Sequence, residues 1–501
     1  MKSKIQSPGW LLLGAMLMLF SNGRWIIPAA TWLYPVCFLH FIRNNSPGYG
    51  FSGIAVISAV VNSISWWKMI PVPLPFYFVL TSVFMNVISL AFLADRLIAE
   101  KMKGFTSTLV FPLLWCSLEF CTSLLPKGTW SSLAYTQAGN LPLLQLASLT
   151  GIWGISFLIT WFASVVNWAW SKYFEWEKIR RGAVIFLTVG LTIWLFGLIR
   201  MNTFPGGTAT VRTASIVNDR NINSDLKTCR WTDAKSIHVF SPEVEENLLS
   251  KTRMAAAGGA KIILWQESAG FLPRHEEENF IDSARVLAAR EKIYLLMTLW
   301  SVPEDFPKRL VENKLIIIDP AGQIRMTYLK NNPAPPEPIK KGDGRLEVLE
   351  TAFGNIAPAI CFDAEFPGFI RQAGQKKAGI FFLPANDWKA IDPIHANMSM
   401  LRAIENGFSL VRAAGQGLSV ATDNRGNMIS SMDYYRTNEQ IMYADVPFFH
   451  SNTLYTRFGD WFAWFCIVGF MGMLLALVLK NFTGRKPGFT MGEKTDLDLQ
   501  S

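Results

Sequence analysis

Residues 355–367 read NIAPAICFDAEFP, an apolar run that ends at a single thiol, Cys361. Two other short apolar runs also end at a reactive side chain: AKIILWQ before Glu267 and IRMTYL before Lys330. If each run forms a strand, the three residues can converge at one edge of a sheet. A carboxylate, an amine and a thiol would supply the base, oxyanion stabiliser and nucleophile that acyl transfer through a thioester needs.

Each of these residues also has an ordinary structural interpretation when it is taken alone. A lone cysteine is often a small core residue, and a strand-end glutamate or lysine is often solvated. Cys361, however, lies where a strand meets a loop, so we expect its thiol to be exposed enough to react. Lys330 enters a loop, 331–338, whose prolines stiffen the chain after the amine. The order Glu, Lys, Cys on three separate strands is more specific than any one member.

Strand-like and helix-like segments alternate around these residues, from 208 to 450. Strand candidates are the runs 209–217, 261–265, 293–299, 315–319, 324–329, 354–361, 379–383, 408–413 and 417–422. Helical patterns fill 242–257, 276–290 and 395–406. The turn sequence Asp319-Pro-Ala-Gly322 predicts that part of the sheet is antiparallel. A mixed sheet covered by helices indicates an α/β layered domain.

The remaining sequence is typical of a membrane protein. Half of the 501 residues are hydrophobic and only 17% are charged, against about 25% in globular chains. Because a spanning helix needs about 20 apolar residues, we predict eight spans: 8–20, 25–42, 51–67, 72–93, 105–125, 144–170, 183–199 and 458–479. The first is short and follows Lys2 and Lys4, as in a signal peptide, but no clear cleavage site follows, so we expect it to be retained.

Lysine and arginine residues in the short loops predict the orientation. Eight spans put both termini on one side, and the loops of that side are the richer in lysine and arginine, so both termini are expected in the cytoplasm. The predicted organisation is a seven-helix transmembrane bundle (1–200), an extracytoplasmic catalytic domain (207–450), a final transmembrane helix (456–481) and a cytoplasmic tail (482–501).

Charge and cysteine content exclude two other classes of function. The formal charge of +9 comes from basic residues where apolar runs end, not from a stripe with interleaved aromatics, so no nucleic acid is expected. No C-x-x-C or Cys/His metal spacing occurs, so no metal or organic cofactor is implied. A disulfide between Cys229 and Cys361 would consume the candidate nucleophile. His395 and the run that begins at His275 are interpreted as solvated or helix-start residues.

The segments around the three residues resemble the nitrilase superfamily, whose catalytic triad is Glu-Lys-Cys in that order. CFDAEFP (361–367) looks like its nucleophile segment, and LPANDW (383–388) looks like the following strand and site loop. Residues 395–426 are similar to its helix–strand–strand continuation. The resemblance implies a four-layer αββα sandwich, with Glu267 as base, Lys330 as oxyanion stabiliser and Cys361 as nucleophile.

Motifs in the apolar half resemble bacterial apolipoprotein N-acyltransferases. WCSLEF (115–120) looks like a fifth-span segment of that family, and GTWSSLAY (128–135) and QLASLTGIWGISF (145–157) are also similar. The family usually carries an arginine soon after the glutamate of the first motif, and none follows Glu119 here. A carboxylate inside a span is costly, and both a functional and a partnered structural role stay open for Glu119.

The same resemblance implies further residues that support the triad. Glu337 corresponds to the family's loop glutamate, although the loop here is proline-rich and one residue shorter. Asp363 follows the cysteine in a Phe-Asp pair where the family has Tyr-Glu. Asn386 and Trp388 belong to the site loop.

The implied protein is a membrane N-acyltransferase of the bacterial inner membrane. Its expected donor is a phospholipid, its expected acceptor is the N-terminal amine of a diacylglyceryl-cysteine apolipoprotein, and a monomer among membrane lipids is expected. A membrane-tethered nitrilase-like amidase or hydrolase would use the same triad with water as acceptor. A non-enzymatic lipid-binding protein with a degenerate fold is the alternative from a different class. The acyl chain and headgroup are not indicated by the sequence.

Overall fold

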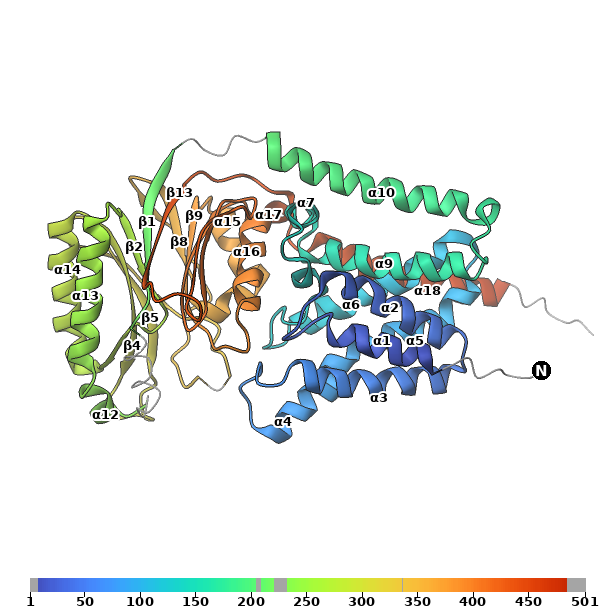
Figure 1. The fold of residues 1–501 in the computed structure, drawn as a ribbon, viewed down its shortest axis with the longest axis horizontal. Coiled ribbons are helices and arrows are strands. Elements are labelled where there is room, and N and C mark those ends of the chain that lie inside the picture. The colour runs from blue at the N-terminus through green and yellow to red at the C-terminus, as the bar shows by residue number, and fades with distance from the viewer. Residues whose placement is uncertain (1–7, 204–208, 220–231, 336, 484–501) are drawn as a thin grey trace, which may run out of the picture.

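The computed structural model describes residues 8–203, 209–219, 232–335 and 337–483. A helical bundle and an α/β domain lie end to end along the long axis of the molecule (Figure 1). The main bundle helices are α1 (Gly9–Leu19), α2 (Pro28–Arg43), α3 (Pro47–Ser65), α4 (Leu74–Val79), α5 (Leu90–Ile98), α6 (Val110–Ser123), α9 (Ile152–Trp170), α10 (Trp176–Thr203) and α18 (Trp461–Thr483). Helix α1 begins and α18 ends at the end of the bundle far from the α/β domain (Figure 1).

Six helical stretches in the described part of the chain are long and apolar enough to cross a membrane: Pro47–Ser65, Leu74–Lys101, Gly104–Ser123, Ile152–Trp170, Trp176–Asn202 and Trp461–Lys480. The first two predicted spans form shorter helices, α1 with 11 residues and α2 with 16. The predicted span 144–170 is interrupted at Gly151, whose φ of +65° ends the preceding turn. The residues before it form the short helices α7 (Leu141–Leu144) and α8 (Ala147–Thr150).

The α/β domain contains two stacked mixed sheets. The first has the order β13-β1-β2-β4-β5-β6, with β3 paired to β4, and the second has the order β12-β11-β10-β9-β8-β7. Strands of the first sheet are β1 (Thr210–Ile216), β2 (Ile262–Trp265), β3 (Gly270–Pro273), β4 (Tyr294–Val302), β5 (Glu312–Ile318), β6 (Ile324–Leu329) and β13 (Ile441–Pro447). Strands of the second are β7 (Leu349–Thr351), β8 (Gly354–Pro358), β9 (Ile380–Asn386), β10 (Ser409–Gly415), β11 (Leu418–Thr422) and β12 (Met428–Asp433).

Helices cover both outer faces, which confirms the predicted four-layer αββα sandwich (Figure 1). The first sheet is covered by α13 (Ser241–Ala257) and α14 (Glu277–Glu291), and the second by α15 (Pro367–Gln375) and α16 (Ile394–Asn406). One apolar core joins the two sheets through residues such as Leu264 and Phe381, and a second lies under α13 and α14. The parallel strands β8, β9 and β10 are buried on both faces, which explains their nearly continuous apolar sequences.

Helix α16 also forms the contact between the α/β domain and the bundle. Ala396, Met400 and Ala403 pack on the sheet, whereas Ile394 and Leu401 belong to the apolar cluster of the bundle. The backbone N–H that begins α9, at Ile152, donates to Glu405 Oε1 of α16 (3.0 Å). This bond satisfies one of the donors that a helix N-terminus leaves unpaired. The α/β domain therefore packs directly against the end of the bundle through α16.

Candidate active site

The three predicted residues come together, but not at one edge of one sheet as expected. Glu267 follows β2 and Lys330 follows β6, both in the first sheet, whereas Cys361 follows β8 in the second sheet. Because each sheet presents an apolar face to the other, the ends of their strands meet at the rim of the shared core. The candidate site lies at this junction between the sheets.

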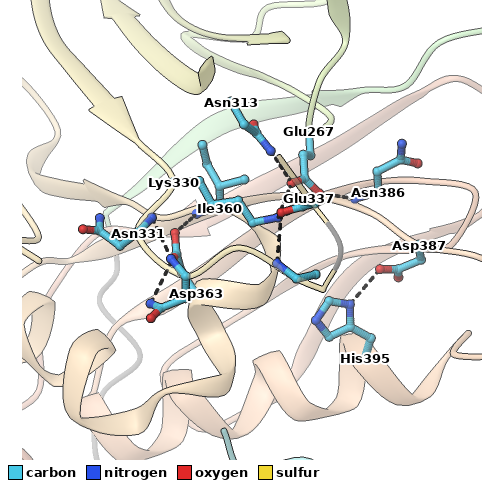
Figure 2. A network of polar contacts seen from close by, with 12 residues as sticks. Glu267, Asn313, Lys330, Asn331, Glu337, Ile360, Asp363, Asn386, Asp387 and His395 are labelled. Carbon is cyan, nitrogen blue, oxygen red and sulfur yellow. Dashed lines mark hydrogen bonds and ion pairs between the residues drawn. The ribbon is translucent and has the colours of Figure 1, made fainter. Parts of the chain in front are cut away.

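A buried polar network surrounds the amine of Lys330 (Figure 2). Its Nζ donates to Glu267 Oε1 at 2.8 Å and to both carboxylate oxygens of Glu337, each at 2.8 Å. Asn313 Nδ2 also donates to Glu267 Oε1 (2.8 Å), and the backbone N–H of Asn386 donates to Glu267 Oε2 (2.9 Å). Glu267 is therefore held by three donors from three elements, with Lys330 fully buried between two carboxylates.

The charges of the site favour an ammonium and a neutral thiol at rest. Burial alone would lower the pKa of Lys330, but the charges of Glu267 and Glu337 outweigh it and raise that pKa well above its usual value. Burial raises the pKa of the Cys361 thiol well above its usual value, and the charge of Glu267 raises it further, while Lys330 acts to lower it. Because the thiolate is the nucleophile, the reaction needs a base that removes the proton as the bond forms.

Cys361 is more buried than the sequence suggested, with only 7% of its surface exposed. It begins a 3₁₀ helix, η7 (Cys361–Glu365), with a φ of +47°. For a residue that carries a side chain this left-handed conformation is strained by roughly 1–3 kcal/mol, and such strain gathers at functional sites. The thiol is free, and Cys229, the other cysteine of this domain, lies outside the described residues.

Asp363 joins the Lys330 loop to the Cys361 turn. Its Oδ1 accepts from the backbone N–H groups of Asn331 (3.1 Å) and Asn332 (2.7 Å), and its Oδ2 accepts from Tyr328 Oη (2.6 Å) and the N–H of Ile360 (3.1 Å). Burial raises the pKa of Asp363, while these hydrogen bonds act to lower it. The carboxylate therefore fixes two loops that come from different sheets.

The two remaining predicted residues are placed differently from each other. Asn386 contributes its backbone N–H, and its exposed side chain points away from Glu267 (Figure 2). Trp388 takes no part in the hydrogen bonds of the triad, since its Nε1 donates to the carbonyl of Lys68 in the bundle (2.8 Å). Trp388 thus belongs to the contact with the membrane half.

A second buried charge cluster next to Cys361 was missed by sequence reasoning. His395 lies in the first turn of α16, as the helix-start interpretation expected, but it is not solvated. It is 2% exposed and pairs with Asp387 and Glu365, and Asp387 also accepts from Arg412. The available signal was the apolar pattern of α16 on two faces, which leaves its first turn no side toward water.

Two groups of described residues bring potential metal ligands close together. One is Cys361, Asp387 and His395, and the other is the exposed group His238, His275 and Glu276. In the first group the Asp387 carboxylate is already bound by Arg412 and His395, so its charge is balanced without a cation. We assign no metal to it.

A loop of the bundle touches the nucleophile helix. The backbone N–H and the hydroxyl of Thr129 both donate to the carbonyl of Glu365, each at 2.9 Å. Gly128 precedes it with a φ of +58°, and a Cβ at this position would lie 2.5 Å from the same carbonyl oxygen. Only glycine allows this approach, so the membrane half holds the end of the helix that Cys361 begins.

Glu119 is a buried residue of α6, and Ser156 Oγ of α9 donates to its Oε1 (3.0 Å). Among the described residues its Oε2 has no hydrogen-bond partner. The carboxylate lines a small cavity of about 60 Å³ together with Lys127, Trp115 and Asn62. Glu119 is therefore partnered through one carboxylate oxygen, and its side chain also lines a cavity.

Two family models match this chain. The model of the apolipoprotein N-acyltransferase N-terminal domain matches residues 14–165, and the carbon-nitrogen hydrolase model matches residues 231–449. A protein named apolipoprotein N-acyltransferase from Geobacter metallireducens is 28% identical over 395 residues, which cover 73% of each chain. Apolipoprotein N-acyltransferase 1 from Treponema denticola is 22% identical and covers 95% of this chain and 96% of its own.

Among solved structures, the α/β half is similar to an amidase of the nitrilase superfamily from Nesterenkonia. That match has 17% identity and a TM-score of 0.39, and it covers 49% of this chain and 92% of the amidase chain.

The αββα sandwich and the family-model match define a carbon-nitrogen hydrolase domain, and this domain is joined to a bundle of candidate membrane helices. The bundle matches the N-terminal domain model of the apolipoprotein N-acyltransferases. The two domain models match the two halves of the chain, and the relatives that cover both halves are named apolipoprotein N-acyltransferases. The chain is an acyltransferase of lipoprotein biosynthesis and a multi-pass membrane protein.

The contact at Gly128 predicts a loss of activity. Gly128→Ala should lower acyltransferase activity about tenfold to a hundredfold, because a small displacement of a catalytic group can cost that much. The matched control is Gly139→Ala, since Gly139 also has a positive φ (+94°) but a Cβ there meets no atom within 4 Å. Both variants carry backbone strain, so equal activities at equal protein stability would show that the Glu365 contact is unimportant.

Proposed function

We propose that the chain transfers a fatty acyl group from a phospholipid to the α-amine of a diacylglyceryl-cysteine apolipoprotein, through a thioester on Cys361. The observation that carries the proposal is the buried Lys330–Glu267 pair beside the Cys361 thiol, in a domain seated on an apolar bundle. The bundle supports lipid substrates because acyl chains need an apolar route to a thiol at the end of the spans.

The first half-reaction forms the thioester. Glu267 accepts the Cys361 proton as the sulfur attacks the ester carbonyl of the phospholipid, and Lys330 stabilises the tetrahedral oxyanion. One such donor contributes roughly 3 kcal/mol. The carbon–oxygen bond then breaks, Glu267 returns the proton to the leaving alkoxide, and a lysophospholipid departs.

The second half-reaction uses the same groups in reverse. The neutral α-amine of the acceptor attacks the thioester carbonyl, Glu267 takes a proton from the amine, and Lys330 again faces the oxyanion. The carbon–sulfur bond breaks and the proton passes to the Cys361 sulfur, which regenerates the thiol and leaves an amide. Two half-reactions through one covalent intermediate define ping-pong kinetics.

The proposed orientation places the α/β domain on the periplasmic side and both termini in the cytoplasm. Support comes from the lysine and arginine bias of the short loops. The end of the bundle far from the α/β domain carries the turn between α9 and α10 (Figure 1). Lys172 lies in this turn, and Arg180 and Arg181 lie in the first turns of α10.

The test is to incubate the purified wild-type protein in detergent with radiolabelled phospholipid and to search for an acyl adduct that hydroxylamine removes. Mass spectrometry should place the adduct on the peptide that contains Cys361. Adding a synthetic diacylated lipopeptide should then discharge it with formation of an N-acyl amide. An adduct on another residue would refute the assigned nucleophile, and discharge by water alone would show a hydrolase.

A further inference from the structure

His395 contacts two carboxylates that come from different loops of the site. Its Nδ1 lies 2.7 Å from Asp387 Oδ1, and its Nε2 lies 3.2 Å from Glu365 Oε1. Glu365 is the last residue of the helix that Cys361 begins, and Asp387 follows Asn386, whose N–H holds Glu267. His395 therefore lies between the nucleophile's helix and the strand end that holds the base.

The charges around His395 balance only when the imidazole carries a proton. The charged or titratable groups that face it are Asp387 beyond β9, Glu365 of η7, Arg412 of β10 and Cys361. Arg412 donates to both oxygens of Asp387, at 2.9 and 2.8 Å, which leaves Glu365 as a second buried carboxylate. Burial acts to lower the pKa of His395, and so does Arg412, whose Nη2 lies 3.1 Å from Nδ1, but Asp387 and Glu365 outweigh both and raise that pKa to about 9.

The cation is also close to the sulfur. Cys361 Sγ, a ring nitrogen of His395 and a carboxylate oxygen of Asp387 all lie within 4.8 Å of one another, and all three residues are buried. On the bundle side, the ring of Trp130 covers the imidazole with centroids 5.7 Å apart and an angle of 32°. Opposite charges interact strongly at such distances when water is excluded.

We propose that His395 is a positioning residue for the nucleophile: its imidazolium holds Glu365 and Asp387 together and compensates the negative charge that forms when Cys361 becomes a thiolate. This inference rests on Cys361 being the nucleophile of the proposed function. It adds a second cation, on the side of the second sheet, to the ammonium of Lys330 on the first.

The test is the pH dependence of Cys361 alkylation by iodoacetamide in the full-length protein in detergent, followed by mass spectrometry of the Cys361 peptide. His395→Gln removes the cation and should move the profile to higher pH, so that the rate near pH 8 falls about tenfold, which corresponds to one pKa unit. His395→Lys should restore most of the rate, because it returns a positive charge. The control His450→Gln changes another partly buried histidine, which contacts the backbone carbonyl of Ala378 and the side chain of Asn452, and should leave the profile unchanged.

If the His395→Gln variant does not fold, a double variant replaces it in the same measurement. In the double variant Glu365→Gln/His395→Gln the remaining Asp387–Arg412 pair is balanced, so the protein should fold, and its profile should still lie above that of the wild type. In a turnover assay, kcat should fall while KM for the phospholipid stays within twofold. A folded variant without His395 whose profile coincides with the wild type would overturn the proposal. Alkylation needs no lipid substrate, so a missing acyl adduct in the wild type would contradict the proposed function without touching this result.

Discussion

Cys361→Ala should abolish both the acyl adduct and the transfer of the acyl chain, with a loss of rate on the order of 10⁴-fold or more. The substitution removes the only cysteine of the α/β domain among the described residues, so no other thiol there can form the thioester. Alanine fits the same space, so the protein should keep its thermal stability. The measurement is turnover with labelled phospholipid and a diacylated lipopeptide, together with the adduct assay.

The matched control for this variant is Cys121→Ala. Cys121 is an exposed thiol on α6 and lies outside the site, so its loss should leave both assays unchanged. If Cys361→Ala retained more than about 1% of the wild-type rate, catalysis would not pass through this sulfur. If Cys121→Ala lost the adduct, the label would have been on the wrong cysteine.

Lys330→Met should reduce both activity and stability. Activity should fall about 10²- to 10³-fold, because one oxyanion donor is lost. Stability should fall by about 3–5 kcal/mol, because Glu267 and Glu337 remain as buried carboxylates without their cation. The measurements are turnover under conditions where the variant is folded, and thermal unfolding in detergent.

Lys314→Met separates the two effects. Lys314 lies on the neighbouring strand β5, is nearly buried, and also bridges two carboxylates, Glu277 Oε1 at 2.5 Å and Glu312 Oε2 at 2.9 Å. The Lys314→Met variant should therefore lose a similar amount of stability and keep the wild-type rate per folded molecule. Equal losses of rate in the two lysine variants would contradict a chemical role for Lys330.

Local sequence patterns predicted most of the α/β fold. All nine predicted strands form, because each is a run of apolar or β-branched residues with a turn at its end, and the Asp319–Gly322 turn correctly predicted an antiparallel pair. The short or exposed strands β3, β7, β12 and β13 were missed. In β12 only one position is buried. In β13 buried positions alternate regularly, but the half-buried Ile441 and Tyr443 between them hide the alternation in the sequence. Strands β3 and β7 have only four and three residues.

The sequence predicted which residues of the site lie at the ends of strands, but it did not predict how those strands are arranged. That Glu267 and Cys361 belong to different sheets depends on strand order, which local patterns do not contain. The contact of Gly128 with Glu365 joins residues more than 230 positions apart, and the burial of His395 depends on the bundle that covers α16. The prediction that the Cys361 thiol is exposed was wrong for the same reason, because neighbouring layers cover the end of its strand.

Helix α18 is synthesised after the α/β domain, yet it packs on α6 through Cys466 and Cys116. During translation, which proceeds from the N-terminus, α6 must therefore wait for its neighbour until the whole α/β domain has been synthesised. The short helix α17 (Leu454–Phe458), just ahead of α18, meanwhile binds Arg371 of α15 through the carbonyl of Thr456 (3.0 Å). The last span thus closes the bundle and anchors the α/β domain in one step, so enzyme maturation should coincide with membrane insertion of this segment.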